Sequence, residues 1–167
     1  MPIHLSFPPD QIYPQDLINY ESCKRLTDYY RAVNDNNWHD KESGMKLLEL
    51  IEHCPLNPTK NKDVKIQKLA QKIVRELDGV RYIQCKSAKD RTSMGHSLEQ
   101  ARILLDEHDL DENFFNQTLE KIRREGTGLL RCYKNVSKYV YAFNAVQLST
   151  FPREYKPPKG TYGTALS

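Results

Sequence analysis

A cysteine and an arginine separated by five residues form the most informative pattern in this sequence. Cys85 follows a β-prone segment, and Arg91 lies at the start of an expected helix. A loop wrapped ahead of a helix N-terminus points backbone N–H groups at an anion, and the helix dipole adds to their positive field. The same field favours the thiolate of Cys85, which is a nucleophile at neutral pH. Because the planar guanidinium of Arg91 can bind two phosphate oxygens, the pattern predicts cleavage of phosphate esters.

The expected reaction has two steps and requires no metal. Cys85 attacks phosphorus and expels an alcohol, which gives a cysteinyl-phosphate. Water then hydrolyses this intermediate, and the hydroxyl group of Thr92 is well placed to assist the departing sulfur. Arg91 and the backbone amides of the loop, including those of Ser87 and Ala88, stabilise the charge on the transferring phosphate.

Two lysines inside the loop, Lys86 and Lys89, bear on the choice of substrate. A bare Cys-x5-Arg pattern arises often by chance, and Cys85 can equally be a small buried residue beside a helix start. In that structural interpretation, Lys86 and Lys89 belong to a solvated surface turn. In the functional interpretation they serve a substrate that carries more than one phosphate, because two cations in so short a loop repel each other unless anions lie between them.

The general acid that protonates the leaving alcohol has two candidates. Asp40 ends the segment Trp38–Asp40, which resembles the Trp-Pro-Asp loop of protein tyrosine phosphatases. The alternative is that Asp40 caps the next helix, a position that Asp favours. Asp90 lies within the phosphate-binding loop itself. The positive charge of its neighbour Arg91 favours the ionised carboxylate, which suits a structural ion pair better than proton donation.

Length, charge and cysteine usage exclude several classes of protein. The chain has 167 residues, enough for one ordinary domain, and its net charge of +3 is too small to indicate a nucleic-acid partner. The four cysteines are widely spaced, so neither a zinc site nor a disulfide framework is expected. Because the sequence has no apolar run of about 20 residues and no secretory signal, we expect a cytoplasmic protein without a transmembrane segment.

Apolar periodicity predicts a helix-rich chain. Helices are expected over 16–34, 41–53, 66–77, 92–107, 111–126 and 139–148. Gly79 is expected to stop the third helix, and Val80–Gln84 has the composition of a strand. Arg123 and Arg124 are expected on a solvated face. The domain organisation follows as an irregular lead-in over 1–15, a phosphatase catalytic segment over 16–151 and an extended Pro- and Gly-rich tail over 152–167.

A single strand cannot form a sheet, since its backbone donors and acceptors need partners. Further strands are therefore expected near residues 3–7 and 129–133, or in polypeptide outside this chain. The predicted fold class is a helix-rich α/β domain of cysteine-phosphatase type. In such a domain a strand, a phosphate-binding loop and a helix follow one another, and here the sheet is expected to be incomplete.

The segment Cys85–Thr92 resembles the signature of the inositol polyphosphate 4-phosphatases. The loop is also similar to those of bacterial effector phosphoinositide phosphatases and lipid 3-phosphatases, which share the pattern Cys-Lys-x-x-Lys-x-Arg. The resemblance to the carboxyl-terminal region of the first family covers most of the chain from Tyr20 onward. Its further segments are Leu98–Gln100, Tyr141–Asn144, Gln147–Leu148, Phe151–Pro152 and Tyr155–Gly163.

This resemblance implies a substrate and a role for each residue of the loop. Family members remove the D-4 phosphate of phosphatidylinositol 3,4-bisphosphate and act on soluble inositol 3,4-bisphosphate and 1,3,4-trisphosphate without magnesium. Cys85 is then the nucleophile and Arg91 the phosphate-binding arginine, while Lys86 and Lys89 hold the neighbouring phosphate. The implied partners are phosphoinositide headgroups, soluble inositol phosphates and an anionic membrane surface, with a peripheral location at membranes.

Family members are far longer, and their amino-terminal C2-type lipid-binding region has no counterpart in this sequence. Membrane recruitment by that route therefore stays open. One alternative function is a truncated, inactive fragment that binds inositol phosphates or acts as a scaffold. Another is a dual-specificity protein phosphatase, which predicts turnover of phosphotyrosine peptides and indifference to the loss of Lys86.

Overall fold

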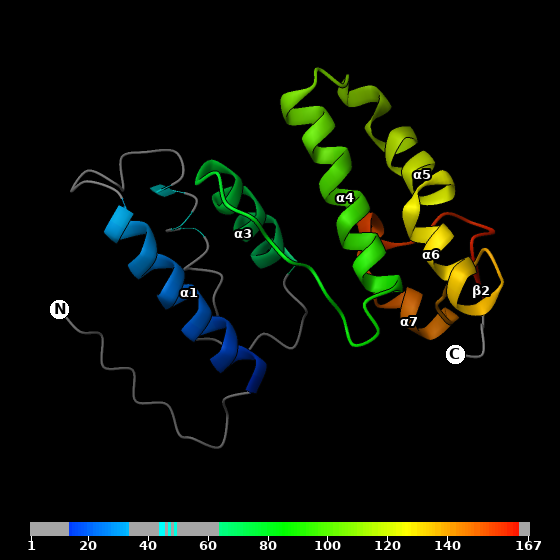
Figure 1. The fold of residues 1–167 in the computed structure, drawn as a ribbon, viewed down its shortest axis with the longest axis horizontal. Coiled ribbons are helices and arrows are strands. Elements are labelled where there is room, and N and C mark those ends of the chain that lie inside the picture. The colour runs from blue at the N-terminus through cyan, green and yellow to red at the C-terminus, as the bar shows by residue number, and fades with distance from the viewer. Residues whose placement is uncertain (1–13, 34–43, 46, 48, 50–63, 164–167) are drawn as a thin grey trace. The chain divides into compact units, whose positions relative to one another are not determined.

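The computed structural model describes residues 14–33, 44–45, 47, 49 and 64–163. The chain divides into two compact units, residues 1–81 and residues 82–167, and each unit is described by itself. Helices are the main elements of both units (Figure 1). The helix-rich character expected from the sequence is therefore confirmed.

The first unit contains two long helices and a small apolar core. α1 (Pro14–Val33) and α3 (Lys65–Glu76) confirm the helices predicted over 16–34 and 66–77 (Figure 1). The helix predicted over 41–53 lies mostly outside the described residues, although its described positions are helical. Buried side chains from all three segments form the core: Cys23, Tyr30, Leu47, Leu69 and Ile73.

α3 ends close to the predicted place, but Asp78 rather than Gly79 has the left-handed conformation. Asp78 has a φ angle of 51°, and the N–H group of Gly79 donates to the carbonyl oxygen of Val74 at 2.8 Å. Asp enters this region more readily than most residues, because its short polar side chain can hydrogen-bond locally. The chain therefore turns one residue earlier than predicted.

Three helices that contact one another form the second unit. They are α4 (Asp90–Glu107), α5 (Phe115–Glu125) and α6 (Thr127–Val136). α4 and α5 confirm the helices predicted over 92–107 and 111–126. Each of the three helices contributes apolar side chains that are almost fully buried: Met94, Leu98, Ala101, Leu119, Leu129 and Cys132.

Short elements complete the second unit. They are η3 (Glu112–Phe114), β1 (Tyr141–Ala142), α7 (Ala145–Ser149), η4 (Arg153–Tyr155) and β2 (Tyr162–Gly163). β1 and β2 form a parallel two-stranded sheet in which Tyr141 pairs with Tyr162 and Ala142 with Gly163. This small sheet is the only regular β-structure within the part of the chain that the structure describes.

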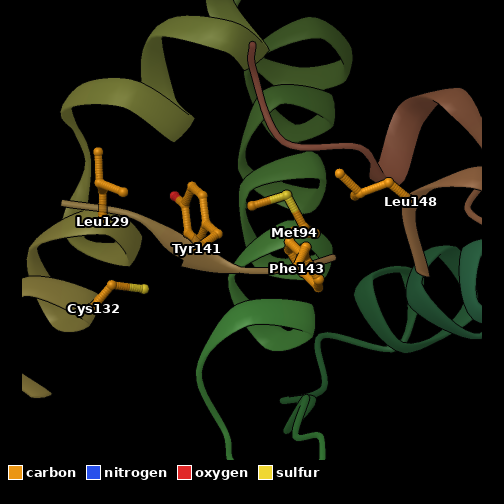
Figure 2. Packing of buried hydrophobic residues seen from close by; sticks show 6 residues of the cluster. All are labelled: Met94, Leu129, Cys132, Tyr141, Phe143 and Leu148. Atoms are coloured by element: carbon orange, nitrogen blue, oxygen red, sulfur yellow. The ribbon is translucent and has the colours of Figure 1, made fainter. Parts of the chain in front are cut away.

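The helix predicted over 139–148 is wrong in its first half. Tyr141 and Phe143 both point into the core, with 1% and 3% of their surface exposed (Figure 2). Alternation with period two is the pattern of a strand. The helix begins only after Asn144, whose side chain accepts the N–H of Gln147 at 2.8 Å while the Gln147 side chain accepts the N–H of Asn144 at 3.1 Å. This reciprocal capping box marks the true start of α7.

Two predicted strands are also wrong. Val80–Gln84 is not a strand in the structure, and the side chains of Val80 and Tyr82 are 82% and 93% exposed. Strand composition is not sufficient, because the backbone groups of a strand need a neighbouring strand. Residues 129–133 lie inside α6. The third predicted strand, over 3–7, lies outside the described residues.

Arg123 is buried rather than solvated, and it holds the carboxyl-terminal tail against α4. Only 3% of its surface is exposed. Its guanidinium donates to the carbonyl oxygens of Glu154 at 2.7 Å and Lys156 at 2.9 Å in the tail. It also donates to the carbonyl of Met94 at 3.0 Å and the hydroxyl of Ser97 at 2.9 Å in α4. Burial lowers the pKa of Arg123 to about 10, so the side chain remains charged at neutral pH.

The carboxyl-terminal tail was predicted to be extended throughout, but it contains the 3-10 turn η4.

Candidate active site

The predicted phosphate-binding segment is a loop that leads directly into α4. Lys89 precedes the helix and Asp90 begins it. Ala88 has a left-handed backbone with a φ of 51°, and its N–H donates to the carbonyl of Cys85 at 3.0 Å. This tight turn brings Cys85 back towards the first turn of α4, where backbone N–H groups lack intrahelical partners. An anion at this position gains from those donors and from the helix dipole.

Thr92 connects the two ends of the loop. Its buried side-chain oxygen accepts the N–H of Cys85 at 2.9 Å. In the same turn of α4, the N–H and hydroxyl groups of Ser93 donate to the carbonyl of Lys89 at 2.8 Å and 2.6 Å. The loop is therefore anchored to the helix at its first residue and at its last.

The thiol of Cys85 is unusually acidic. Burial opposes its ionisation, but hydrogen bonds from Thr92 and Ser87 outweigh burial and lower the pKa of Cys85 to about 6. The sulfur lies 3.9 Å from the hydroxyl oxygen of Ser87. The thiol is therefore mostly ionised at pH 7, in the form that acts as a nucleophile.

The cationic side chains of the loop remain accessible to a ligand. Lys86 and Arg91 are exposed, and Lys89 is partly buried. Arg91 is the second residue of α4. The structure thus brings Cys85 and Thr92 into contact and places three cations within the seven residues from Cys85 to Arg91. That concentration of positive charge suits a polyanionic ligand.

Of the two candidate general acids, the structure describes only Asp90. Its carboxylate is buried, and Oδ1 accepts the N–H of Ala142 at 2.9 Å and the thiol of Cys132 at 3.6 Å. These bonds tie the start of α4 to β1 and α6, instead of the ion pair with Arg91 that the sequence favoured. Asp40 lies outside the described residues.

Sequence reasoning missed a further cation beside the loop. The side chain of Arg131 on α6 donates to the carbonyl of Ala88 at 3.4 Å and is otherwise exposed. Arg131 follows Ala88 by 43 positions, in a segment predicted to be a strand, so no spacing rule connected the two. Only the packing of α6 against α4 brings this charge to the loop.

The described part of the chain offers no alternative centre of metal chemistry. No group of three His, Cys, Asp or Glu side chains there has the arrangement that would hold a metal ion. Cys23, Cys85 and Cys132 form no disulfide bond in this part of the chain. None of the helices searched in this part is both long and apolar enough to cross a membrane.

Comparison with known proteins identifies the family. Residues 10–155 match the INPP4A C-terminal domain. The chain belongs to this family. It is 43% identical over 157 residues to the inositol polyphosphate 4-phosphatase type II of Homo sapiens and to the type II inositol 3,4-bisphosphate 4-phosphatase of Pongo abelii. It is 40% identical over 158 residues to the type II inositol 3,4-bisphosphate 4-phosphatase of Rattus norvegicus.

The likeness covers nearly all of this chain and a small part of its relatives. Each alignment covers 90% of the chain, and the chain spans 17% of the length of these relatives. No solved structure matches the chain. The resemblance drawn from the Cys85–Thr92 loop is confirmed at the level of the family.

Proposed function

We propose that the chain is a catalytic segment of a phosphoinositide 4-phosphatase that removes the D-4 phosphate of phosphatidylinositol 3,4-bisphosphate and of soluble inositol 3,4-bisphosphate or 1,3,4-trisphosphate. The observation that carries the proposal is the acidic thiol of Cys85, with a pKa of about 6, in a lysine-bearing loop at the start of α4. Membership of the INPP4A C-terminal domain family and the names of the relatives support the substrate class.

In the proposed first step the Cys85 thiolate attacks phosphorus in line with the ester oxygen. The S–P bond forms as the P–O bond to the inositol ring breaks, and the leaving oxygen takes a proton from a general acid. In the second step water attacks phosphorus and the S–P bond breaks. Inorganic phosphate leaves, the water gives up a proton, and the thiolate returns. The hydrogen bonds of Thr92 that favour the Cys85 thiolate also favour sulfur as the leaving group.

Charge stabilisation falls to the loop and its cations. The backbone N–H group of Ser87 and the guanidinium of Arg91 would bind the oxygens of the transferring phosphate. The N–H of Ala88 donates to the carbonyl of Cys85 in the structure, so it would join them only if that bond opens. Lys86 and Lys89 would hold the neighbouring D-3 phosphate. The exposure of Lys86 and Arg91 supports this assignment, because both charges are accessible to a ligand.

The general acid remains a proposal between Asp40 and Asp90. The hydrogen bonds from Ala142 and Cys132 to Asp90 support a structural role for this carboxylate. These bonds engage Oδ1 of Asp90 within the fold, whereas a general acid must reach the leaving oxygen. Asp40 lies outside the described residues and stays a prediction from the sequence.

A second function, binding of inositol phosphates without turnover, is favoured by one observation: Asp90, the candidate general acid that the structure describes, is bonded to Ala142 and Cys132 within the fold. Phosphate release from soluble inositol 3,4-bisphosphate separates the two, with binding measured in parallel by calorimetry. We expect release by the unmodified chain and none by Cys85→Ser. The matched control is Cys23→Ala, which removes the thiol of a cysteine in the other unit. Binding without release in the unmodified chain would establish the second function, and release by Cys85→Ser would contradict the proposed mechanism.

A further inference from the structure

One face of α6 is apolar and basic, and it is exposed. Leu130 and Tyr133 are 42% and 41% exposed, and Lys134 lies beside them at the spacing that places residues on one face of a helix. The opposite face of α6 is buried. Figure 2 shows Leu129 and Cys132 on the side of the helix that faces Tyr141 in the core. The core contacts of α6 therefore come from its buried face, and its exposed face contributes nothing to them.

The turn after α6 extends this exposed surface. Ser137 has a left-handed backbone with a φ of 55° and reverses the chain at the end of the helix. The ring of Tyr139 stacks on the ring of Tyr133, with centroids 4.4 Å apart and planes within 10°. Tyr139 is 56% exposed, and Lys138 beside it is exposed as well. We call the surface formed by Leu130, Tyr133, Lys134, Lys138 and Tyr139 the α6 face.

The sequence that forms the α6 face carries charge of a single sign. From Glu125 to Glu154 the sequence contains no acidic residue between the two glutamates, while Arg131, Lys134 and Lys138 fall inside this stretch. Tyrosine rings, apolar at the body and polar at the hydroxyl, are enriched where a bilayer meets water. Lysines that flank such rings are attracted to anionic headgroups. A uniformly anionic lipid surface complements this composition.

The α6 face adjoins the catalytic loop. Arg131 lies at the edge of the exposed arc of α6, and its guanidinium donates to the carbonyl of Ala88 within the loop. Lys86 in that loop is also exposed. A surface that contacts α6 from the solvent side would therefore approach the loop as well, as a substrate that is part of a bilayer requires.

We propose that the α6 face docks on anionic phospholipid bilayers and presents the Cys85 loop to lipid headgroups. The proposal rests on the proposed function for its purpose, but the docking itself needs no turnover. The stacked tyrosines and Leu130 would enter the headgroup layer, while Lys134 and Lys138 pair with lipid phosphates and carboxylates.

The test is co-sedimentation of the full chain with vesicles of phosphatidylcholine alone and of phosphatidylcholine mixed with phosphatidylserine. We expect binding to the anionic vesicles that weakens in high salt. Changing Lys134 and Lys138 together to Gln should weaken this binding about 30-fold, because each basic residue near such a surface contributes about 1 kcal/mol. The matched control changes Lys121 and Lys159, two exposed lysines of the same unit outside the α6 face, to Gln. The control should bind like the unmodified chain.

A second variant tests the aromatic contribution. The double change of Tyr133 and Tyr139 to Ser should also weaken vesicle binding. Circular dichroism shows whether this variant folds. If it does not fold, the result for the variant of Lys134 and Lys138 decides the test. Two results would overturn the proposal: no vesicle binding by the unmodified chain, or binding that the change of Lys134 and Lys138 to Gln leaves unaltered. Either result would leave a protein partner as the occupant of the α6 face. Turnover of soluble inositol 3,4-bisphosphate is measured on the same samples. If turnover is absent but the lysine pair loses vesicle binding, the proposed function fails and the docking surface stands.

Discussion

Cys85 and Cys132 belong to the same unit, yet their thiols have opposite acidities. Hydrogen bonds from Thr92 and Ser87 overcome partial burial and lower the pKa of Cys85 to about 6. Burial and the adjacent carboxylate of Asp90 raise the pKa of Cys132 to about 11. The difference shows that the groups around a thiol determine its chemistry, because donors favour the thiolate whereas an apolar site and a neighbouring negative charge favour the thiol.

Asp90 and the loop around it separate these two environments. Its carboxylate faces Cys132 and the N–H of Ala142, on the inner side of the start of α4. Cys85 lies on the loop before the helix, where Thr92 and Ser87 supply donors. The eight residues from Cys85 to Thr92 thus contain both a structural carboxylate and a candidate catalytic centre. The predictions below change one of these environments while the other stays intact.

The largest effect is expected when Cys85 loses its main donor. Thr92→Val removes a hydrogen bond to an ionised group, of the kind that contributes about 1.5–3 kcal/mol. The pKa of Cys85 should rise towards the ordinary thiol value, and the ratio of thiolate to thiol at a fixed pH should fall about 10- to 100-fold. The measurement is the alkylation rate of Cys85 against pH. Thr127→Val, at an exposed threonine of α6, is the matched control. An unchanged profile in Thr92→Val would mean that Thr92 does not hold the thiolate.

The second effect concerns the structural environment. Asp90→Ala leaves the partly buried N–H of Ala142 without its acceptor, so the free energy of unfolding should fall by about 2 kcal/mol. Asp90→Asn keeps an oxygen acceptor and should recover most of this loss. Urea unfolding measures both variants, and phosphate release is measured alongside. If Asp90→Asn keeps its stability but loses phosphate release, Asp90 acts as the general acid and the structural interpretation is wrong.

The two thiols should also make stability depend on pH with opposite signs. The pKa of Cys85 lies below the ordinary thiol value of about 8.5, so its contribution is present above that pH and is lost as pH falls through 6. The pKa of Cys132 is raised to about 11, so its contribution is complete below about pH 8.5 and is lost as pH rises towards 11. Neither slope can exceed about 1.4 kcal/mol per pH unit.

Urea unfolding across this pH range checks both signs. Cys85→Ser should flatten the profile on the acid side, and Cys132→Ala should flatten it on the alkaline side. Each variant is the control for the other, since each leaves one slope in place. If Cys85→Ser leaves the free energy of unfolding unchanged between about pH 6 and 8, Cys85 makes no pH-dependent contribution to stability, and the predicted opposite signs are wrong.

Much of the helical structure was predictable because it follows a local pattern. The apolar residues of α3 and α4 recur every three or four positions, and the structure buries Leu69, Ile73, Met94 and Leu98 among them. The family was also predictable, because the residue types from Cys85 onward are specific to it.

The errors arose where partners distant in the sequence decide the structure. Val80–Gln84 has the residues of a strand but no strand beside it among the described residues. Arg123 was expected in solvent because a lone arginine gives no sign of the carbonyl groups that surround it. Its partners lie on α4 and in the tail, 26 to 33 positions away. The contact between Arg131 and Ala88 has the same origin, since it depends on how α6 packs.

The pH profile of Cys85 alkylation in the unmodified chain, with each cysteine followed by mass spectrometry, tests the central claim most directly. We expect a rate that rises with a midpoint near pH 6 and that inorganic phosphate suppresses, because phosphate would occupy the same loop. A midpoint at about 8.5, together with no protection by phosphate, would mean that Cys85 is an ordinary thiol and would contradict the proposed mechanism.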